Sequence, residues 1–567
     1  MSDKLLVAAI DFGTTYSGYA FSFSHEYASD QTKIQTNTWI GGGHISLKAP
    51  TSVLFTPGKV FHSFGYEAED KYSELAEDGH HADWFYFRRF KMMLHNNEAL
   101  SRKTLLDDEH KKPLEALTVF SAAINFLRGH LFQTLLKRVP EIEEGDIHWV
   151  LTLPAIWNDS AKQFMRRAAE MGGLRNDRLI LALEPEAASF WCKTLPVERL
   201  TKSGGMDIFQ PGKCYIVLDL GGGTVDITVH QVQGDGSLTE VAKASGGAWG
   251  GTQVDAQFQA LLEALVGKGF MTEYQKEFTG DFLDMMREFE VKKRTVTSNK
   301  SGMITMRIPA SLVSNYKTRK GRLLVDDVRK SGHAGKVDFK RDKILIDAEV
   351  FKGFFDKSVQ TTIAHVREIL KGNDFRSIDT MLLVGGFAES EIVQNKIKET
   401  FLDKKIIIPN DSGLVVVKGA VLFGHNPNIV TSRISKYTYG TEIINTFVDG
   451  VHPEKYRVFE NGRYKCRYLF EIYVRAGEAV PVNAVVSMDF ISDTFDVAEG
   501  VGIYASSDPD PQYVTEKSCF KLGSIVLEEA RHRLLNEMQF GGTEFTLQIT
   551  DLETGVKRIN CFDFLSH

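Results

Sequence analysis

The chain has 567 residues, of which 43% are hydrophobic and 25% are charged. This composition is typical of ordinary globular proteins, and the length exceeds what one hydrophobic core supports, so about three or four domains are expected. The formal net charge is −7, because 74 acidic residues outnumber 67 basic ones. That acidic balance argues against a nucleic-acid-binding protein.

Cysteine usage and the N-terminal segment indicate the compartment. The five cysteines are scattered and form no CxxC pair, which suits a reducing compartment and offers no metal site. The first apolar run ends at Asp11 and is too short for a signal peptide. No apolar segment approaches the ~20 residues that cross a bilayer. We therefore expect a cytoplasmic protein without a membrane span.

Hairpins and then alternating helices and strands are predicted in the first part of the chain. Strands are expected within residues 5–23, 49–55 and 60–65, bounded by proline and glycine. A helix near residues 115–138 has apolar residues spaced by three and four. Two strand–helix pairs follow: 147–154 with 158–173, and 178–185 with 185–193.

The same order of elements returns from residue 214. Strands are expected within residues 214–232, 379–386 and 404–409, and helices at 252–266, 348–371, 390–401 and 413–424. Residues 196–212, rich in glycine and proline, are interpreted as the join. The repetition predicts a duplicated α/β domain with one lobe at residues 1–195 and the other at 211–427.

The pattern changes after Pro427. Short, β-rich segments separated by turns predict a small β domain over residues 433–567, with one helical stretch near residues 524–538. Its segment at 468–482 alternates in hydrophobicity, which fits a sandwich core as well as a groove for an extended peptide.

Two strands broken by glycine carry the chemistry. "IDFGTTYSGYAF" begins at Ile10, and "LDLGGGTVDITV" begins at Leu218. Each is interpreted as a hairpin whose turn brings backbone N–H groups and threonine hydroxyls close to phosphate oxygens. The aspartate before each turn, Asp11 or Asp219, is placed to hold hydrated Mg²⁺. Two ordinary hairpins are the alternative, but the same motif in both halves favours a clamp on a polyphosphate.

Six segments in the expected order resemble the heat shock 70 kDa family, within the superfamily that includes actin and sugar kinases. They are the two hairpins, "VLTLPAIWNDSAKQFMRRAAEMGGL", "LALEPEAAS", "EVKKRTVTS" and "MLLVGGFAES". The resemblance covers roughly residues 4–427, and the chain is most similar to the divergent heat shock 70 kDa protein 12 branch. It implies an α/β fold with a two-lobed, actin-like (ribonuclease-H-like) ATPase domain, followed by a truncated substrate-binding-like β module without a helical lid.

The resemblance also implies residue roles around ATP or ADP with Mg²⁺. Catalytic roles fall on Asp11, Arg88, Glu184, Asp219, Thr224 and Asp226, with Asp11 and Asp219 also positioning the metal. Nucleotide-binding roles fall on Gly13, Thr14, Thr15, Tyr16, Gly221, Gly222, Gly223, Thr224, Gly250, Gly251, Glu290, Lys293, Arg294, Gly385 and Gly386. The implied reaction is in-line attack of water on the γ-phosphoryl group.

Several positions depart from the family pattern. Arg88 aligns with the family's essential lysine, with Arg89 and Lys91 as close alternatives, and an arginine there predicts slow hydrolysis. Glu389 replaces the arginine that stacks on the base, and Glu186 replaces a threonine. The acidic, leucine-rich linker is replaced by "HNPNIVTSRISKYTYG", and the helical lid and the acidic C-terminal motif are missing.

Four functions are compatible with parts of this pattern. The first is an ATP-binding, chaperone-like protein with slow ATPase activity and polypeptide binding by the β module, with client proteins and co-chaperones as partners. The second is a nucleotide-gated adaptor with little or no turnover. A small-molecule kinase is disfavoured because no sugar-contacting motif is found. An actin-like filament former is disfavoured because of the β-rich C-terminal region.

Overall fold

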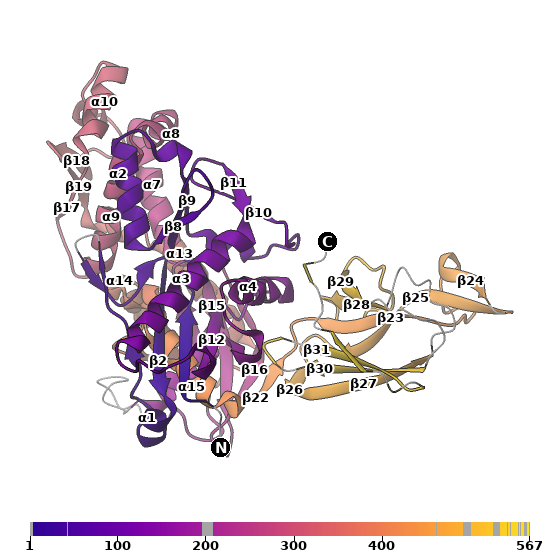
Figure 1. Ribbon diagram of the computed structural model, residues 1–567. Coiled ribbons are helices and arrows are strands. Elements are labelled where there is room, and N and C mark those ends of the chain that lie inside the picture. The colour runs from indigo at the N-terminus through magenta and orange to yellow at the C-terminus, as the bar shows by residue number, and fades with distance from the viewer. Residues whose placement is uncertain are drawn as a thin grey trace.

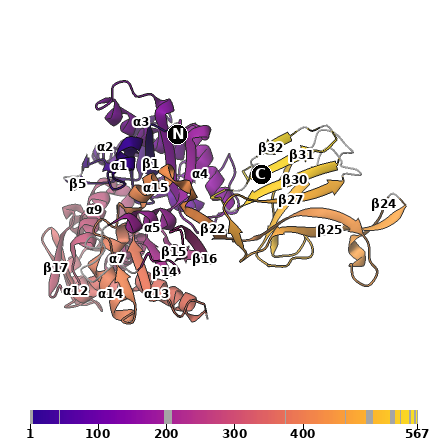
Figure 2. The same cartoon turned by 90° about the horizontal axis from the view of Figure 1, so that it is seen from below.

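Two central β-sheets organise the larger part of the chain, and a β-rich module projects from one side of them (Figures 1 and 2). The computed structural model describes residues 4–41, 44–195, 208–372, 374–460, 462–491, 501–525, 533–540, 542–544, 546–553, 555, 557–560 and 564–565. Most of the predicted join lies at residues 196–207, outside the described residues. Within the described ranges, no helix is long and apolar enough to span a bilayer.

The first sheet is built around an antiparallel hairpin followed by two parallel strands. Its order is β13–β12–β1–β2–β3, and β6 pairs with β2. These strands are β1 (Leu6–Asp11), β2 (Tyr16–Phe23), β3 (Gln35–Thr36), β6 (Ala49–Pro50), β12 (Ile147–Leu153) and β13 (Leu179–Leu183). The helices of this half are α1 (Ser24–Ser29), α2 (Tyr66–Glu77), α3 (Ala116–Leu136), α4 (Asp159–Met171) and α5 (Glu184–Thr194).

The second sheet repeats this plan in the order β21–β20–β14–β15–β16–β22–β26. Its strands are β14 (Cys214–Leu220), β15 (Val225–Val232), β16 (Leu238–Gly247), β20 (Thr380–Val384), β21 (Lys405–Ile407), β22 (Val430–Ile434) and β26 (Ala479–Pro481). Parallel strand β20 pairs with β14 as β12 pairs with β1. The repeated arrangement is that of a two-lobed α/β fold, as expected from the sequence.

Helices α5 and α15 (Val415–His425) join the two lobes at their base. The rings of Phe190 and Phe423 stack with centroids 5.9 Å apart. A Cβ atom on Gly419 would lie only 1.6 Å from the carbonyl oxygen of Ala187, so the helices touch through their backbones. One apolar cluster spans both sheets and these helices, and it includes Val7, Val150 and Val217.

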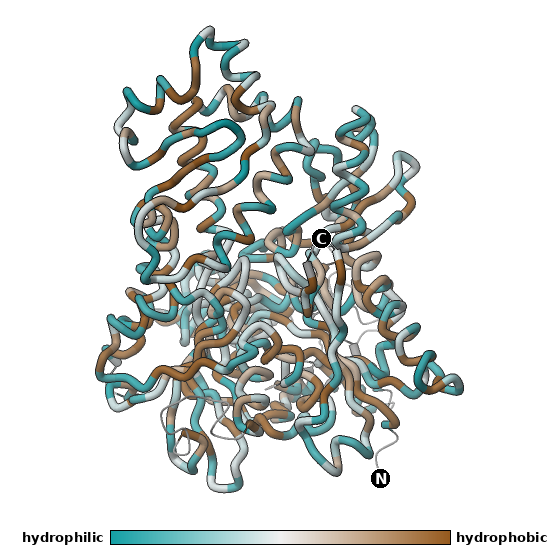
Figure 3. Tube along the Cα trace, turned by 90° about the vertical axis from the view of Figure 1, so that its left-hand side faces the viewer, coloured by the Kyte–Doolittle hydropathy of each residue, from teal (hydrophilic) through white to brown (hydrophobic). Residues whose placement is uncertain are grey.

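Smaller elements extend each lobe above its sheet. The first lobe carries β4 (Trp39–Gly41), β5 (His44–Ser46), β7 (Ser52–Phe55), β8 (Phe61–Phe64), β9 (Phe85–Arg88), β10 (Leu105–Asp107) and β11 (Pro113–Glu115). The second carries β17 (Met303–Arg307), β18 (Val337–Lys340), β19 (Lys343–Asp347), α7 (Thr252–Val266), α8 (Lys268–Glu277), α9 (Thr279–Thr295), α10 (Ala310–Lys320) and α11 (Leu324–Arg329). Hydrophilic and hydrophobic stretches alternate along the chain trace (Figure 3).

One long predicted helix is two helices in the structure. Residues 348–371 form α12 (Ala348–Gly353) and α13 (Asp356–Lys371), with α14 (Glu391–Thr400) following β20. The break follows Gly353, whose residue type disfavours helix continuation.

The C-terminal module consists of two antiparallel sheets around one core. The strands are β23 (Thr438–Thr446), β24 (Arg457–Glu460), β25 (Arg463–Val474), β28 (Val501–Ser506) and β29 (Cys519–Ile525) in one sheet, and β27 (Ala484–Ile491), β30 (Arg533–Phe540), β31 (Thr546–Asp551) and β32 (Lys557–Asn560) in the other. Strands β22 and β26 instead extend the second sheet of the α/β body, so the module continues that sheet.

The helix predicted near residues 524–538 is wrong where the structure describes it. Residues 533–540 form strand β30, paired with β27 and β31, and residues 526–532 lie outside the described part. Asn536, Met538 and Phe540 are buried, while the residues between them are half-buried. This period of two is that of a strand with one face in a core.

Candidate functional site

A cavity of about 400 Å³ lies between the two lobes, and both glycine-containing hairpins line it. Most of the predicted site residues meet here. The lining includes Asp11, Gly13, Thr14, Thr15, Tyr16, Glu184, Asp219, Gly221, Gly222, Gly223, Thr224, Gly251, Glu290, Lys293, Arg294, Gly385 and Gly386. Of the predicted residues, Arg88, Asp226 and Gly250 do not line it.

The two hairpin turns approach each other closely across this cavity. A Cβ atom on Gly222 would lie 2.2 Å from Oγ1 of Thr15, and one on Gly223 would lie 2.6 Å from Oγ1 of Thr14. Real Cβ atoms do not come so near, so glycine is required at both positions. Residues that lie more than two hundred positions apart in the sequence thus form one wall of the cavity.

Gly250 supports the second turn from behind. The backbone N–H groups of Gly250, Gly251 and Thr252 donate to the carbonyl oxygens of Gly223, Gly221 and Gly222, at 3.1, 3.1 and 2.8 Å. These bonds hold the turn at the start of α7. Gly251 lines the cavity, whereas Gly250 faces the turn itself.

Buried carboxylates gather at the base of the cavity. Burial raises the pKa of Glu184 to about 7. The Lys91 ammonium opposes this rise, and the carboxylates of Asp11 and Asp226 add to it. Burial and then the neighbouring Glu184 carboxylate raise the pKa of Asp219 well above its usual value. Such an excess of buried negative charge favours a bound cation.

Asp226 lies behind the second turn and not at the cavity surface. Its Oδ1 accepts a hydrogen bond from the backbone N–H of Ile156 at 3.1 Å. Burial raises the pKa of Asp226, and the Ile156 N–H and the Thr224 hydroxyl oppose that rise. Asp226 therefore links the turn to the segment after β12.

Lys91, and not Arg88, brings a cation to these carboxylates. Lys91 Nζ lies 2.8 Å from Glu184 Oε1, and both side chains are buried. Arg88 instead pairs with Glu109 at 3.7 Å and lines a separate cavity of about 80 Å³. The placement of Arg88 at the phosphate site is thus corrected. Strand β9 ends at Arg88, Arg89 adopts a left-handed φ of 55°, and the chain turns Lys91 inward.

Lys48 is a cavity residue that sequence reasoning missed. Its Nζ lies 2.5 Å from Asp11 Oδ2. A single lysine before Ala49 and Pro50 carries little signal in the sequence, since most lysines are exposed. The pairing of β6 with β2 is what brings it beside the first hairpin.

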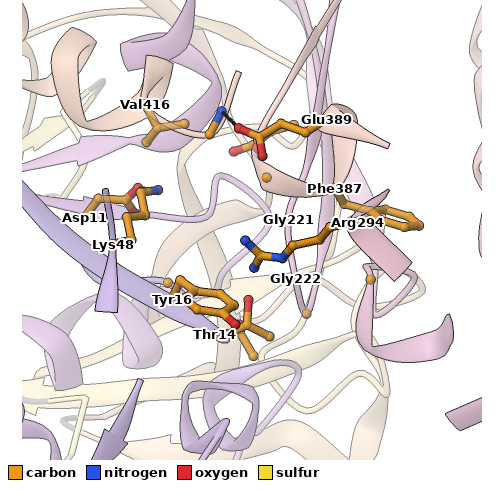
Figure 4. A pocket seen from close by; sticks show the side chains of 18 of the residues that line it. Asp11, Thr14, Tyr16, Lys48, Gly221, Gly222, Arg294, Phe387, Glu389 and Val416 are labelled. Atoms are coloured by element: carbon orange, nitrogen blue, oxygen red, sulfur yellow. Dashed lines mark hydrogen bonds and ion pairs between the residues drawn. The ribbon is translucent and has the colours of Figure 1, made fainter. Parts of the chain in front are cut away.

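Charged groups from helix α9 form the opposite side of the cavity. Glu290 pairs with Lys293 at 2.5 Å and with Arg294 at 2.7 Å. Burial alone would raise the pKa of Glu290, but these two cations lower it to about 2. The guanidinium of Arg294 lies 4.4 Å from the centre of the Tyr16 ring and reaches into the cavity (Figure 4).

Glu389, Gly385 and Gly413 also line the cavity. Glu389 Oε1 accepts a hydrogen bond from the Gly413 N–H at 3.0 Å (Figure 4). Gly385 has a φ of +87°, and a Cβ atom there would lie 2.4 Å from Asp219 Oδ1. The β20 turn therefore closes directly on the carboxylates.

The carboxylates of this cavity fit a divalent cation that keeps its water ligands better than one coordinated entirely by side chains. In the described part of the chain, no group of three or more His, Cys, Asp or Glu residues is arranged to hold a metal. Asp11 and Asp219 nevertheless line one cavity together with two loops suited to phosphate. Mg²⁺ keeps several waters and binds through one or two carboxylates plus phosphate oxygens.

Comparison with known proteins agrees with this architecture. A family model described as Hsp70 protein matches residues 127–427. The chain is 33% identical to Heat shock 70 kDa protein 12B of Homo sapiens, over 99% of this chain and 91% of that protein. It is 31% identical to Heat shock 70 kDa protein 12A of Homo sapiens, over 99% and 92%. It is 27% identical to Chaperone protein DnaK of Psychrobacter cryohalolentis, over 52% and 41%. The chain therefore belongs to the Hsp70 family, in the divergent branch of the heat shock 70 kDa proteins 12A and 12B.

Proposed function

We propose that this protein binds ATP and ADP with Mg²⁺ in the cavity between its lobes and hydrolyses ATP slowly. The observation that carries the proposal is the contact of the two turns, with Gly222 against Thr15, above a cluster of buried carboxylates. Converging backbone N–H groups and threonine hydroxyls favour the oxygens of a polyphosphate. Membership of the Hsp70 family supports the same chemistry.

Each residue would contribute through position and charge. The turn that begins at Gly13 and the turn at Gly221 would hold the β- and γ-phosphates from two sides. Asp11 and Asp219 would hold the metal through its waters, and the metal would supply charge neutralisation at the phosphates. Glu184, with its pKa raised to about 7, would orient the attacking water.

Lys91 would take the place of the family's lysine. Its ammonium is held by Glu184 and lies 5.0 Å from the centre of the Trp157 ring, so its position is fixed by two partners. A fixed positive charge that faces the transferring phosphoryl group stabilises the charge that develops there. The sugar and base would lie toward Glu290, Lys293 and Arg294, with Gly385 and Gly386 behind them.

We further propose that the module formed by residues 433–567 binds polypeptide in a chaperone-like role. The module is connected to the nucleotide-binding body by side chains as well as by β22. Tyr439 donates to Asp159 at 2.7 Å, and Arg166 forms hydrogen bonds of 2.7 and 2.9 Å from its Nε to Glu544.

The four cysteines in the described residues are free, which supports a reducing, cytoplasmic location.

A nucleotide-gated adaptor with little turnover is the second candidate. The observation that favours it is the replacement of the family's acidic linker by β22, which is paired into the second sheet and carries the buried Arg433. A firmly docked module suits a protein that presents one surface to a partner.

Calorimetry and a turnover assay on the same preparation test both candidates. Titration of ATP with and without Mg²⁺ into the wild type and Asp219→Ala measures the gain that the metal provides. We expect that gain to be lost in Asp219→Ala, because a carboxylate that holds the metal is gone. Equal gains would contradict the assignment. Tight ATP binding with no measurable hydrolysis and no suppression of client aggregation would leave only the adaptor.

A further inference from the structure

Lys48 places an ammonium group on Asp11, where the first turn begins. Its Nζ lies 2.5 Å from Asp11 Oδ2, and the two side chains are only 18% and 7% exposed. The other oxygen, Asp11 Oδ1, accepts a hydrogen bond from the Thr152 hydroxyl at 3.1 Å. Both carboxylate oxygens of Asp11 therefore have donors within the chain.

The backbone leads Lys48 to this position. Strand β6 pairs with β2, with Ala49 opposite Ser17, so Lys48 comes next to Gly18. Gly18 is also the partner of Asp11 across the β1–β2 hairpin. A Cβ atom on Gly18 would lie 3.0 Å from Lys48 Cγ, so a larger residue there would crowd the lysine stem. The stem thus crosses the strand at a residue without a side chain and ends on Asp11.

We propose that Lys48 is a phosphate-binding residue of this cavity and that it shares Asp11 with the divalent cation. The proposal rests on the proposed nucleotide function. Lys48 lines the same cavity as both turns, and Figure 4 shows it beside Asp11. Lysine carries its charge on a flexible four-carbon stem, so the ammonium can exchange the Asp11 carboxylate for a phosphate oxygen nearby.

Part of the charge neutralisation in this cavity then comes from the chain itself. Lys48 reaches the phosphate region from the segment before β6, and Lys91 reaches it from the turn after β9. When Lys48 contacts phosphate, Asp11 is free to hold a hydrated cation. When Lys48 is removed, Asp11 is left as an added negative charge beside the phosphates unless a cation neutralises it. Loss of Lys48 must therefore hurt binding most when Mg²⁺ is absent.

Calorimetric titration of ATP in Mg²⁺ and in EDTA tests this inference. The variants are Lys48→Met, which keeps the size of the side chain, and Lys48→Arg, which keeps its charge. Lys371→Met is the control, because Lys371 is exposed and pairs only with Glu368 among the described contacts. Equal thermal unfolding midpoints establish that the variants are folded.

We expect Lys48→Met to lower ATP affinity about 10- to 100-fold in EDTA, as for one lost charge-assisted hydrogen bond, and by a smaller factor in Mg²⁺. Lys48→Arg is expected to lose less than Lys48→Met, and Lys371→Met to lose nothing. If the wild type binds ATP and Lys48→Met has the same ATP affinity, this inference alone is overturned. The same holds if Lys48→Met loses ATP affinity by the same factor in Mg²⁺ and in EDTA. Absence of ATP binding by the wild type would overturn the proposed nucleotide function and this inference together.

Discussion

Arg433 forms a bidentate ion pair with Glu186. Arg433 Nε donates to Glu186 Oε1 at 2.7 Å, and a terminal nitrogen donates to Oε2 at 2.8 Å. The side chains are 10% and 3% exposed, so the pair is removed from solvent. Arg433 lies on β22, whereas Glu186 lies in the first turn of α5, two residues after Glu184. This pair therefore links the strand that leads into the C-terminal module to the helix that begins at the cavity between the lobes.

Arg433→Met is expected to destabilise the protein by about 3–5 kcal/mol, because it leaves the Glu186 carboxylate buried without its partner. The double variant Arg433→Met with Glu186→Met is expected to recover most of that loss, since it removes both charges. Urea unfolding measures these changes. A single variant as stable as the wild type would show that the ion pair does not hold β22 in place.

The stability of this junction is expected to fall between about pH 4.5 and pH 7 because of Glu240. Burial raises the pKa of Glu240 from 4.5 to about 7, so the folded state favours the protonated form. That advantage is present below the unfolded pKa and is lost as the pH rises through the folded one. Glu240→Gln carries no charge and still offers an oxygen to the Ile434 N–H, which donates to Glu240 at 3.0 Å.

Glu240→Gln should therefore stabilise the protein by about 3 kcal/mol at pH 8 and by under about 1 kcal/mol at pH 5. Thermal unfolding of both proteins across this pH range provides the check. Parallel stability curves would mean that Glu240 titrates normally in the folded protein.

Lys91→Met is expected to slow ATP hydrolysis by roughly 100-fold, as for the loss of one fixed charge at a transition state. ATP affinity should change much less, because the two turns still hold the phosphates. Single-turnover measurements suit this test, since they quantify slow hydrolysis. Arg88→Met is the matched control, because Arg88 pairs with Glu109 outside the cavity. Hydrolysis that depends on Arg88 and not on Lys91 would assign the phosphate-facing cation to Arg88.

Much of the fold follows from local sequence pattern. The apolar spacing of three and four predicts α3, and the strand-like runs that end in Asp11 and Asp219 predict β1 and β14. The prediction of a helix near residues 524–538 was wrong. Every second residue there, namely Asn536, Met538 and Phe540, is buried because these residues belong to a strand of the sheet. Pairing partners of this kind are not encoded in a short window of residues.

Some residues of the candidate site could also be predicted from the sequence, and others could not. Glycines and aspartates of the two turns are visible in the sequence because their spacing is itself the motif. The two lysines were harder to place. Choosing Lys91 over Arg88 depends on the left-handed backbone at Arg89, and finding Lys48 depends on the register of β6 against β2. The first is a local backbone conformation and the second a tertiary pairing, and neither can be read from charge and spacing alone.

Two turns from opposite lobes are proposed to hold a nucleotide between them. Calorimetric titration of Mg-ATP into the wild type and Gly222→Val tests this proposal most directly, because a side chain at residue 222 would collide with Thr15. We predict one saturable site in the wild type. In the variant we predict at least a roughly tenfold loss of affinity, because the collision would move one of the two turns away from the phosphates. Absence of binding by the folded wild type, or equal affinity in both proteins, would show that the two turns do not hold a nucleotide.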